Sequence, residues 1–157
     1  MKFTVKRAAF IKKLNDVQRA ISSKTTIPIL TGLKLDVESD QIILTGSDAD
    51  ISIETVLDAK NEDNGLSITD PGKIVLPAHF FSDIVKRLPE DSMTVEITEG
   101  FQTEISSGAA EFTINGLDAN NYPHLPELDG NDQIQLSGNV FKQLISQTVL
   151  AVSTQES

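Results

Sequence analysis

The sequence predicts an α+β fold built from repeated units, each made of a strand, a helix and further strands. Hydrophobic residues change twice from alternate spacing to helical spacing, and strand-like runs follow each helical segment. Much of the pattern of residues 3–23 also returns in chemical type 131 residues later. Strand–helix units that recur in register indicate an internally repeated fold.

The first unit occupies about residues 1–70. Residues 2–6 alternate as a short strand, and residues 8–21 have helical spacing. The apolar stripe of this helix consists of Phe10, Leu14, Val17 and Ile21, with Ile11 toward its edge. Further strands are expected over residues 29–35, 42–45 and 51–57, and a polar loop over residues 61–65.

The second unit occupies about residues 71–128 and repeats this order. A strand is expected over residues 73–76, followed by a helix that ends at Leu88-Pro89. The apolar stripe of this helix consists of Phe80, Phe81, Ile84, Val85 and Leu88. Strands are expected over residues 93–97, 103–106 and 111–114. Residues 117–133 are rich in Asp, Asn, Pro and Gly and predict an irregular linker.

A third unit begins near the end of the chain. Ile134 and Leu136 correspond to the strand residues Phe3 and Val5 at the offset of 131 residues, and a helical stripe follows them. We therefore interpret residues 129–157 as linker plus the first strand and helix of a truncated second domain. A lone strand and helix cannot bury their apolar stripe, so the chain is expected to be a fragment of a longer protein.

Composition places the protein in a broad class. The chain has no cysteine, which excludes disulfides, thiolate metal sites and cysteine catalysis. No signal peptide is visible at the N-terminus, and no run approaches the roughly 20 apolar residues of a membrane-spanning helix. These observations predict a soluble cytoplasmic protein that is not bound to a membrane.

Charge is distributed unevenly along the chain. The net charge is −10, yet residues 1–24 hold seven basic residues against one acidic residue. Residues 25–72 hold two basic residues against ten acidic ones. A local block of one sign within a chain of the other sign indicates a two-faced surface. The alternative is a chance fluctuation over a short chain.

The usual signatures of enzymes and metal sites are missing from the sequence. It has no GxGxxG, Walker A or HExxH motif, and its two histidines, His79 and His124, are far apart. Asp48, Asp50 and Glu54 could suggest a cation site, but turn and strand-edge roles on an acidic exterior fit them better. We therefore expect no catalytic residue, no metal and no cofactor.

Several short motifs, in their order and spacing, carry a resemblance to a known family. They are Met1-Lys2-Phe3-Thr4-Val5, Ile27-Pro28-Ile29-Leu30, Leu44-Thr45-Gly46-Ser47-Asp48, Val75-Leu76-Pro77-Ala78 with Phe81, Leu88-Pro89, Asn121-Tyr122-Pro123 and Ser153-Thr154-Gln155-Glu156-Ser157. Together they resemble the N-terminal part of the bacterial DNA sliding clamp, the β subunit of DNA polymerase III. The last five residues are similar to those of low-GC Gram-positive versions.

The resemblance implies the DNA clamp fold, in which duplicated units place helices on one side and antiparallel sheets on the other. In that family two subunits of three domains close head to tail into a ring around duplex DNA. The ring acts as a processivity factor that tethers the replicative polymerase and catalyses nothing itself. Full-length homodimers, sequence-independent binding of double-stranded DNA, and binding of DNA polymerase III and the clamp loader through domains absent here are therefore expected.

The resemblance also implies DNA-contacting residues. Lys24 follows the first helix, His79 begins the second, and Gln155 is the counterpart of Lys24 in the next domain. Lys12 and Arg19 face away from the core stripe of residues 8–21 and are candidates to line the hole. The alternatives are a solvated charge for each basic residue, a surface amide for Gln155 and a local helix-terminal role for His79.

A subunit interface is implied at residues 111–114. Phe112 and Ile114 point the same way along a strand and would pack against the partner's third domain. In a lone domain both would simply be core residues, and that alternative stays open. Relatives carry basic residues just before this strand, whereas Ala109, Ala110 and Glu111 stand here, which weakens the ionic part of the interface.

Two other functions fit the composition. One is an acidic protein-binding scaffold that does not bind DNA. The other is a hydrolase or small-ligand protein on an α+β fold, which scattered carboxylates alone support.

Overall fold

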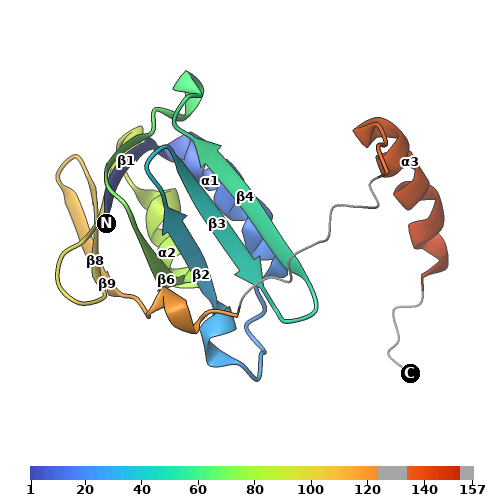
Figure 1. Ribbon diagram of the computed structural model, residues 1–157, viewed down its shortest axis with the longest axis horizontal. Coiled ribbons are helices and arrows are strands. Elements are labelled where there is room, and N and C mark those ends of the chain that lie inside the picture. Colours follow the sequence, from blue (N-terminus) through green and yellow to red (C-terminus); the bar gives the residue numbers. More distant parts are fainter. Residues whose placement is uncertain (124–133, 153–157) are drawn as a thin grey trace. The chain divides into compact units, whose positions relative to one another are not determined.

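The computed structural model of the protein describes residues 1–123 and 134–152. It divides into two units, Met1–His124 and Leu125–Ser157, and each unit is described by itself (Figure 1). The first unit holds two antiparallel sheets and two α-helices, and the second holds one α-helix.

One sheet of the first unit has five strands in the order β5-β1-β7-β8-β9. The strand bounds are Lys2–Lys6 for β1, Ser67–Asp70 for β5, Ser92–Ile97 for β7, Gln102–Ser107 for β8 and Ala110–Asn115 for β9. Phe3 lies opposite Val95, and Val5 opposite Met93, in the pairing of β1 with β7. All four side chains are buried, so this register aligns the apolar positions of the two strands on the core face.

The other sheet has four strands in the order β4-β3-β2-β6. The strand bounds are Gly32–Val37 for β2, Gln41–Ser47 for β3, Ser52–Asp58 for β4 and Gly72–Pro77 for β6. Leu35 lies opposite Leu44 of β3 and Ile74 of β6, and all three side chains are buried. Core residues therefore run across the middle of this sheet as well.

The two repeated units exchange their first strands. β1 belongs to the first repeat (about residues 1–70) but pairs with β7 of the second repeat (about residues 71–128), and β6 belongs to the second repeat but pairs with β2 of the first. Each sheet thus contains strands of both repeats, and neither repeat has a complete sheet of its own. The duplication makes one compact unit, Met1–His124, because the two repeats are joined through main-chain hydrogen bonds.

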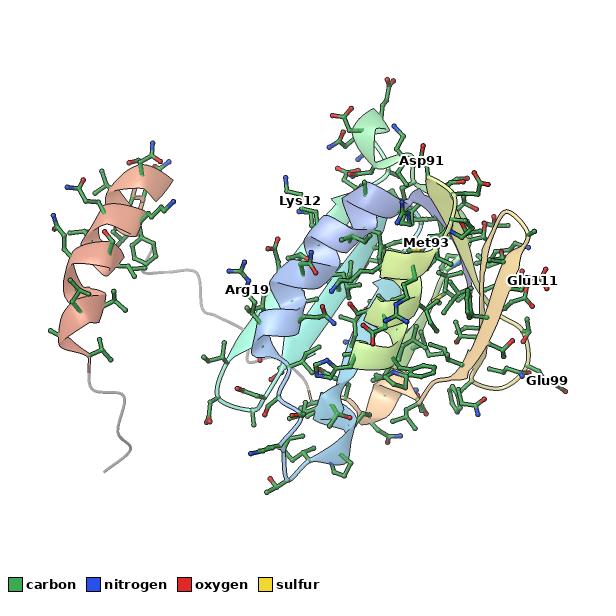
Figure 2. The ribbon with its side chains drawn as sticks, turned by 180° about the vertical axis from the view of Figure 1, so that it is seen from behind. Lys12, Arg19, Asp91, Met93, Glu99 and Glu111 are labelled. Atoms are coloured by element: carbon green, nitrogen blue, oxygen red, sulfur yellow. The ribbon has the colours of Figure 1, made fainter. Side chains whose placement is uncertain are left out.

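Both helices lie on the same side of the sheet β4-β3-β2-β6 (Figures 1 and 2). α1 (Arg7–Val17) packs on β3 and β4 and continues as a short 3-10 helix, η1 (Gln18–Ala20), whereas α2 (Ala78–Arg87) packs on β2 and β6. Phe10 and Phe81 meet between the helices, edge to face, with ring centroids 5.8 Å apart. The expected helices on one side and antiparallel sheets on the other are present.

The predicted strand over residues 29–35 needs correction. Pro28–Thr31 form a 3-10 helix (η2), and the strand begins only at Gly32. Pro28 at the first helical position has the fixed φ that a helical turn accepts and has no N–H to offer to a sheet. β5 was not predicted, because Ser67–Asp70 is short and Ile68 is its single apolar residue.

Phe80 was predicted to belong to the buried stripe of α2, and this was wrong. Its side chain is 62% exposed, whereas Phe81 is fully buried. At about 100° per residue, Phe81, Ser82, Ile84 and Val85 cover the arc of the helix that faces the core, and Phe80 lies outside that arc.

The start of the predicted irregular linker also needs correction, because residues 117–122 pack against β6 and η2. Leu117 forms an isolated bridge with Val75, and residues 119–121 form a 3-10 helix (η4). Tyr122 packs in a small cluster with Leu30 and Val75. The segment covers the free edge of β6, which would otherwise leave strand N–H and C=O groups unpaired.

In the second unit, α3 (Gly138–Thr148) confirms the helix expected there, and a 3-10 turn (η5, Val149–Ala151) follows it. The predicted strand at Ile134 and Leu136 is not formed, since residues 134–137 have no regular structure. A strand needs a partner for its main-chain groups, and the described residues of this unit supply none.

Candidate nucleic-acid interface

Two of the predicted DNA-contacting residues lie on the exposed side of the first helical segment. Lys12 and Arg19 are both exposed and seven residues apart, which is close to two helical turns. Both extend from the same edge of the segment, on the side away from α2 (Figure 2). The buried stripe of Phe10 and Leu14 turns the opposite face to the core, and this fixes the direction of the two cations.

Lys24 lies in the loop that follows η1. The Ser22 Oγ accepts a hydrogen bond from the Lys24 N–H at 3.1 Å, and the Thr25 Oγ1 accepts one from the Ile27 N–H at 3.1 Å. Two such side-chain turns in the six residues 22–27 shape the loop locally. The Lys24 side chain is exposed.

His79 is the second residue of α2 and is exposed. The start of α2 lies next to the end of α1, because the Gln18 Nε2 donates a hydrogen bond to the Ala78 carbonyl at 3.4 Å. Arg19 and His79 each adjoin one of these bonded residues. The structure therefore gathers Arg19, His79 and the loop of Lys24 at one end of the helix pair.

The other end of the helix pair is fastened by Arg7. Its Nε donates to the Glu90 carbonyl at 3.0 Å, and its Nη1 donates to the Lys86 carbonyl at 3.4 Å. The first residue of α1 thus satisfies carbonyls at the end of α2, so the helices run antiparallel. Lys86 and Arg87, in the last turn of α2, add positive charge on this side.

The helical side is not purely basic, because Asp16 and Asp83 are exposed on α1 and α2. Three of its cations lack ion-pair partners. Lys12, Arg19 and Lys24 form no ion pair with any carboxylate of residues 1–123 and 134–152. Their charges are therefore available to an outside anion.

Two lysines on the strands, Lys2 and Lys73, behave differently. Lys2 of β1 contacts Glu96 at 2.7 Å, and Lys73 of β6 contacts Asp36 at 2.7 Å. The hydrogen bond to Glu96 raises the pKa of Lys2, and the hydrogen bond to Asp36 raises the pKa of Lys73. Each lysine is thereby held in its charged form, but the neighbouring carboxylate cancels that charge.

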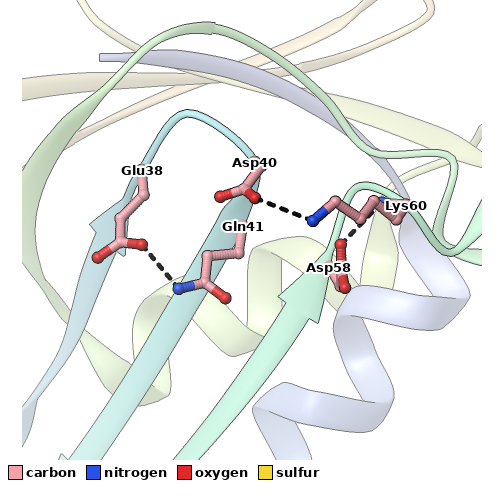
Figure 3. A network of polar contacts seen from close by, with 5 residues as sticks. All are labelled: Glu38, Asp40, Gln41, Asp58 and Lys60. Atoms are coloured by element: carbon pink, nitrogen blue, oxygen red, sulfur yellow. Dashed lines mark hydrogen bonds and ion pairs between the residues drawn. The ribbon is translucent and has the colours of Figure 1, made fainter.

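A lysine in the turns between strands is also paired with a carboxylate. In Figure 3 the Lys60 Nζ lies 3.5 Å from Asp40, while its main-chain N–H donates to Asp58 at 2.8 Å. Gln41 donates to Glu38 at 2.7 Å in the same network. A single lysine thus lies among several acidic residues, and this end of the strands β2, β3 and β4 keeps a net negative charge.

The candidate cation site at Asp48 is a turn. The Asp48 Oδ1 accepts hydrogen bonds from the N–H groups of Asp50 and Ile51, at 3.0 and 2.8 Å. These bonds, first that from Ile51, lower the pKa of the Asp48 carboxyl group. In the described part of the chain no group of three acidic or histidine side chains could hold a metal ion. None of its helices has the length and apolar character needed to cross a membrane.

The comparisons with known proteins agree with this architecture. Residues 1–126 match the family described as the N-terminal domain of the DNA polymerase III beta subunit. The chain belongs to this family. The resemblance and the α+β clamp fold predicted from the sequence are thereby confirmed.

Individual relatives support the assignment. The chain is 50% identical to a beta sliding clamp of Staphylococcus epidermidis over 99% of its own length and 42% of the relative's. It superposes on the DNA polymerase sliding clamp of Bacillus subtilis with a TM-score of 0.95 at 47% identity, covering 100% of this chain and 42% of that one. The DNA polymerase III beta chain of Streptococcus pneumoniae gives a TM-score of 0.96 at 40% identity, with 99% and 41% coverage. This chain therefore spans less than half the length of these relatives.

The predicted interface residues of this family member fall in different environments. β9 pairs only with β8, so its other edge is free within the described residues. Phe112 is 41% exposed on this strand, whereas Ile114 is 6% exposed and belongs to the domain's own core. The alternative of a core role thus applies to Ile114, and Phe112 alone presents its side chain.

Sequence reasoning missed the surroundings of Phe112. A hollow of about 370 Å³ is lined by Phe80, Asp83, Ile84, Arg87, Phe112 and Thr113. The signal that could have revealed it is the position of Phe80, which at helical spacing lies outside the arc that Phe81, Val85 and Leu88 turn to the core. Gln155 lies outside the described residues, so its predicted role stays a prediction.

Proposed function

We propose that this chain forms the N-terminal domain, residues 1–128, and the opening of the middle domain, residues 129–157, of a sliding clamp subunit. The full-length subunit would encircle duplex DNA as a homodimeric ring and tether the replicative DNA polymerase. It would act in the cytoplasm as a non-catalytic accessory protein without a cofactor. DNA polymerase III and the clamp loader would bind through domains that this chain lacks.

The observation that carries the proposal is the difference between cations that are paired with carboxylates and cations that are not. Three lysines of the strands and turns, Lys2, Lys60 and Lys73, are paired with carboxylates, whereas Lys12, Arg19 and Lys24 on the helical side are not, within the described ranges 1–123 and 134–152. Duplex DNA carries one negative charge per roughly 1.7 Å, and unpaired cations attract it without reading its sequence. The acidic strands repel DNA and direct it to the helical side.

A sliding ring needs weak contacts. A closed ring is retained on DNA by topology, so strong phosphate contacts would only slow its movement. The exposed lysines and arginine of this surface suit that requirement, because they lie on long flexible side chains. His79 at the start of α2 and Gln155 in the next domain would add polar contacts of the same kind.

Ring closure would use the free edge of β9. An exposed edge pairs readily with a strand of another chain, and Phe112 with the neighbouring hollow offers an apolar seat for partner side chains. Ile114 would support this strand from inside the core.

The experiment compares circular with linear DNA. Full-length subunit loaded on nicked circular plasmid should stay bound through gel filtration and should dissociate once the plasmid is linearised. Replacing Lys12, Arg19 and Lys24 together by glutamine should reduce DNA binding. It should also lower the log–log slope of affinity against salt by about 0.9 for each phosphate that is no longer neutralised.

The matched control is Lys60→Gln, which removes a cation already paired with an acid. Equal retention on circular and linear DNA would contradict the ring. Equal salt slopes for the control and the triple variant would contradict the DNA-facing role of the helices.

A further inference from the structure

The side chain of Gln18 joins the two helices through three hydrogen bonds. Its Nε2 donates to the Ala78 carbonyl at 3.4 Å, and its Oε1 accepts from the Ser82 Oγ at 3.1 Å and from the Lys86 Nζ at 3.4 Å. Ala78, Ser82 and Lys86 are spaced four residues apart, so they form one stripe of α2. Gln18, just beyond the end of α1, faces this stripe.

Ser82, the buried residue of this stripe, restricts the orientation of the Gln18 amide. Ser82 is only 1% exposed, and its hydroxyl donates to the Gln18 Oε1. A buried hydroxyl that loses its partner is costly, so the Gln18 amide is held in one orientation. The carbonyl oxygen that accepts from Ser82 is therefore fixed in place beside Lys86.

Lys86 differs in this respect from the other cations of the helical side. Its ammonium is exposed but donates to a fixed acceptor, whereas Lys12 makes no side-chain hydrogen bond within residues 1–123 and 134–152. The acceptor is a neutral amide, so it restrains the ammonium without cancelling its charge. The main chain of the same residue is held by Arg7 through the Lys86 carbonyl.

We propose that Gln18 is a positioning residue that holds the Lys86 ammonium at the junction of α1 and α2, where it presents a fixed charge to a phosphate. The contribution to DNA binding rests on the proposed function, whereas the restraint on Lys86 does not. A neutral acceptor at this position keeps the charge that the carboxylates opposite Lys2 and Lys73 remove.

The first test measures the restraint without DNA. Lysine acetylation by an N-hydroxysuccinimide ester, followed by mass spectrometry of the 157-residue chain, reports the accessibility of each amine. Gln18→Leu should raise the reactivity of Lys86 about twofold to tenfold, the range that one net hydrogen bond supplies. Lys12 is the internal control, and Gln41→Leu is the matched variant, since Gln41 bonds Glu38 on the sheet edge.

A second variant covers the case in which Gln18→Leu does not fold. Gln18→Glu keeps an acceptor for Ser82 and Lys86 but adds a negative charge, so Lys86 should become less reactive than in the original protein. Unchanged Lys86 reactivity in the folded variants would overturn the proposal.

The last test uses the full-length subunit on DNA. Lys86→Met should lower the log–log slope of DNA affinity against salt by up to about 0.9. Gln18→Leu should lower this slope toward the value of Lys86→Met. If Gln18 acts through Lys86, the double variant should bind no more weakly than Lys86→Met, whereas additive losses would overturn the proposal. If the unaltered subunit is not retained on circular DNA, the proposed function fails, and the acetylation result still decides the role of Gln18.

Discussion

α1 and α3 carry the same apolar pattern in two different surroundings. Phe10 and Leu14 of α1 are fully buried, whereas their counterparts Phe141 and Ile145 of α3 are 54% and 48% exposed. Both segments are helices with the same spacing of apolar residues. Burial requires strands on which the stripe can pack, and among the described residues only the first unit has them.

The two helices also begin differently. Ser137 caps α3, with its Oγ accepting a hydrogen bond from the Val140 N–H at 3.4 Å. The N-cap position of α1 is Lys6, which makes no side-chain cap. A helix packed on two sheets is stabilised by its buried face, whereas an exposed helix depends more on its local signals.

The largest effect is expected from Phe10→Ala. It should lower the free energy of unfolding of the first unit by about 3–5 kcal/mol, because a fully buried aromatic ring leaves a cavity. Phe141→Ala, the matched change in α3, should leave that free energy unchanged. Urea unfolding followed by circular dichroism measures both, and equal losses would show that α3 has a packed face.

Replacing alanine by glycine should change the stability in opposite directions at two positions that differ in backbone conformation. Ala49, in the turn between β3 and β4, has a φ of 86°, which strains any residue with a Cβ. Ala49→Gly should therefore raise the stability by about 1 kcal/mol, whereas Ala8→Gly in α1 should lower it by about 1 kcal/mol. Thermal unfolding of both variants checks the prediction, and a loss in both would contradict the strain.

Removal of the N-cap side chain should weaken the exposed helix α3. Ser137→Ala should destabilise α3 by about 0.5–1 kcal/mol and reduce its helicity, measured by NMR chemical shifts of residues 138–148. The first unit should be unaffected. Unchanged helicity would mean that α3 is stabilised by contacts outside its own first turn.

The smallest effect at neutral pH concerns Tyr122, which docks the end of the first unit. Burial raises the pKa of its hydroxyl above the ordinary 10.0, so the folded state retains this proton more tightly than the unfolded chain. Its stabilising contribution is complete below pH 10 and is lost as the pH rises through the folded pKa. Tyr122→Phe should lose less stability than the original protein above pH 10, as measured by urea midpoints. Identical pH profiles would contradict the burial of the hydroxyl.

Local pattern was enough to predict much of this fold. The strand of residues 2–6, the two helices of the first unit and the helix of the second follow from the spacing of apolar residues alone. Errors arose where another constraint overrode the pattern. Pro28 favoured a helical turn over a strand, and Phe80 lies outside the arc of α2 that faces the core.

The candidate site was predictable only in part. Lys12 and Arg19 were placed correctly on the face opposite the core because helical geometry dictates it. Phe112 and Ile114 share one side of a strand, and sequence cannot tell which of them the rest of the domain covers. The hydrogen bonds of Gln18 could not be predicted, because they join residues at least 60 positions apart.

By itself, the sequence determined the helices, most of the strands, the repeated order of the two units and the clamp family to which the chain belongs. These properties depend on neighbours within a few turns or on the motifs themselves. Only the tertiary structure decided which strands pair, which cations are neutralised and which apolar side chains stay exposed. Those outcomes depend on contacts between distant segments, such as β1 with β7 and Lys73 with Asp36, whose partners are chosen only when the chain folds.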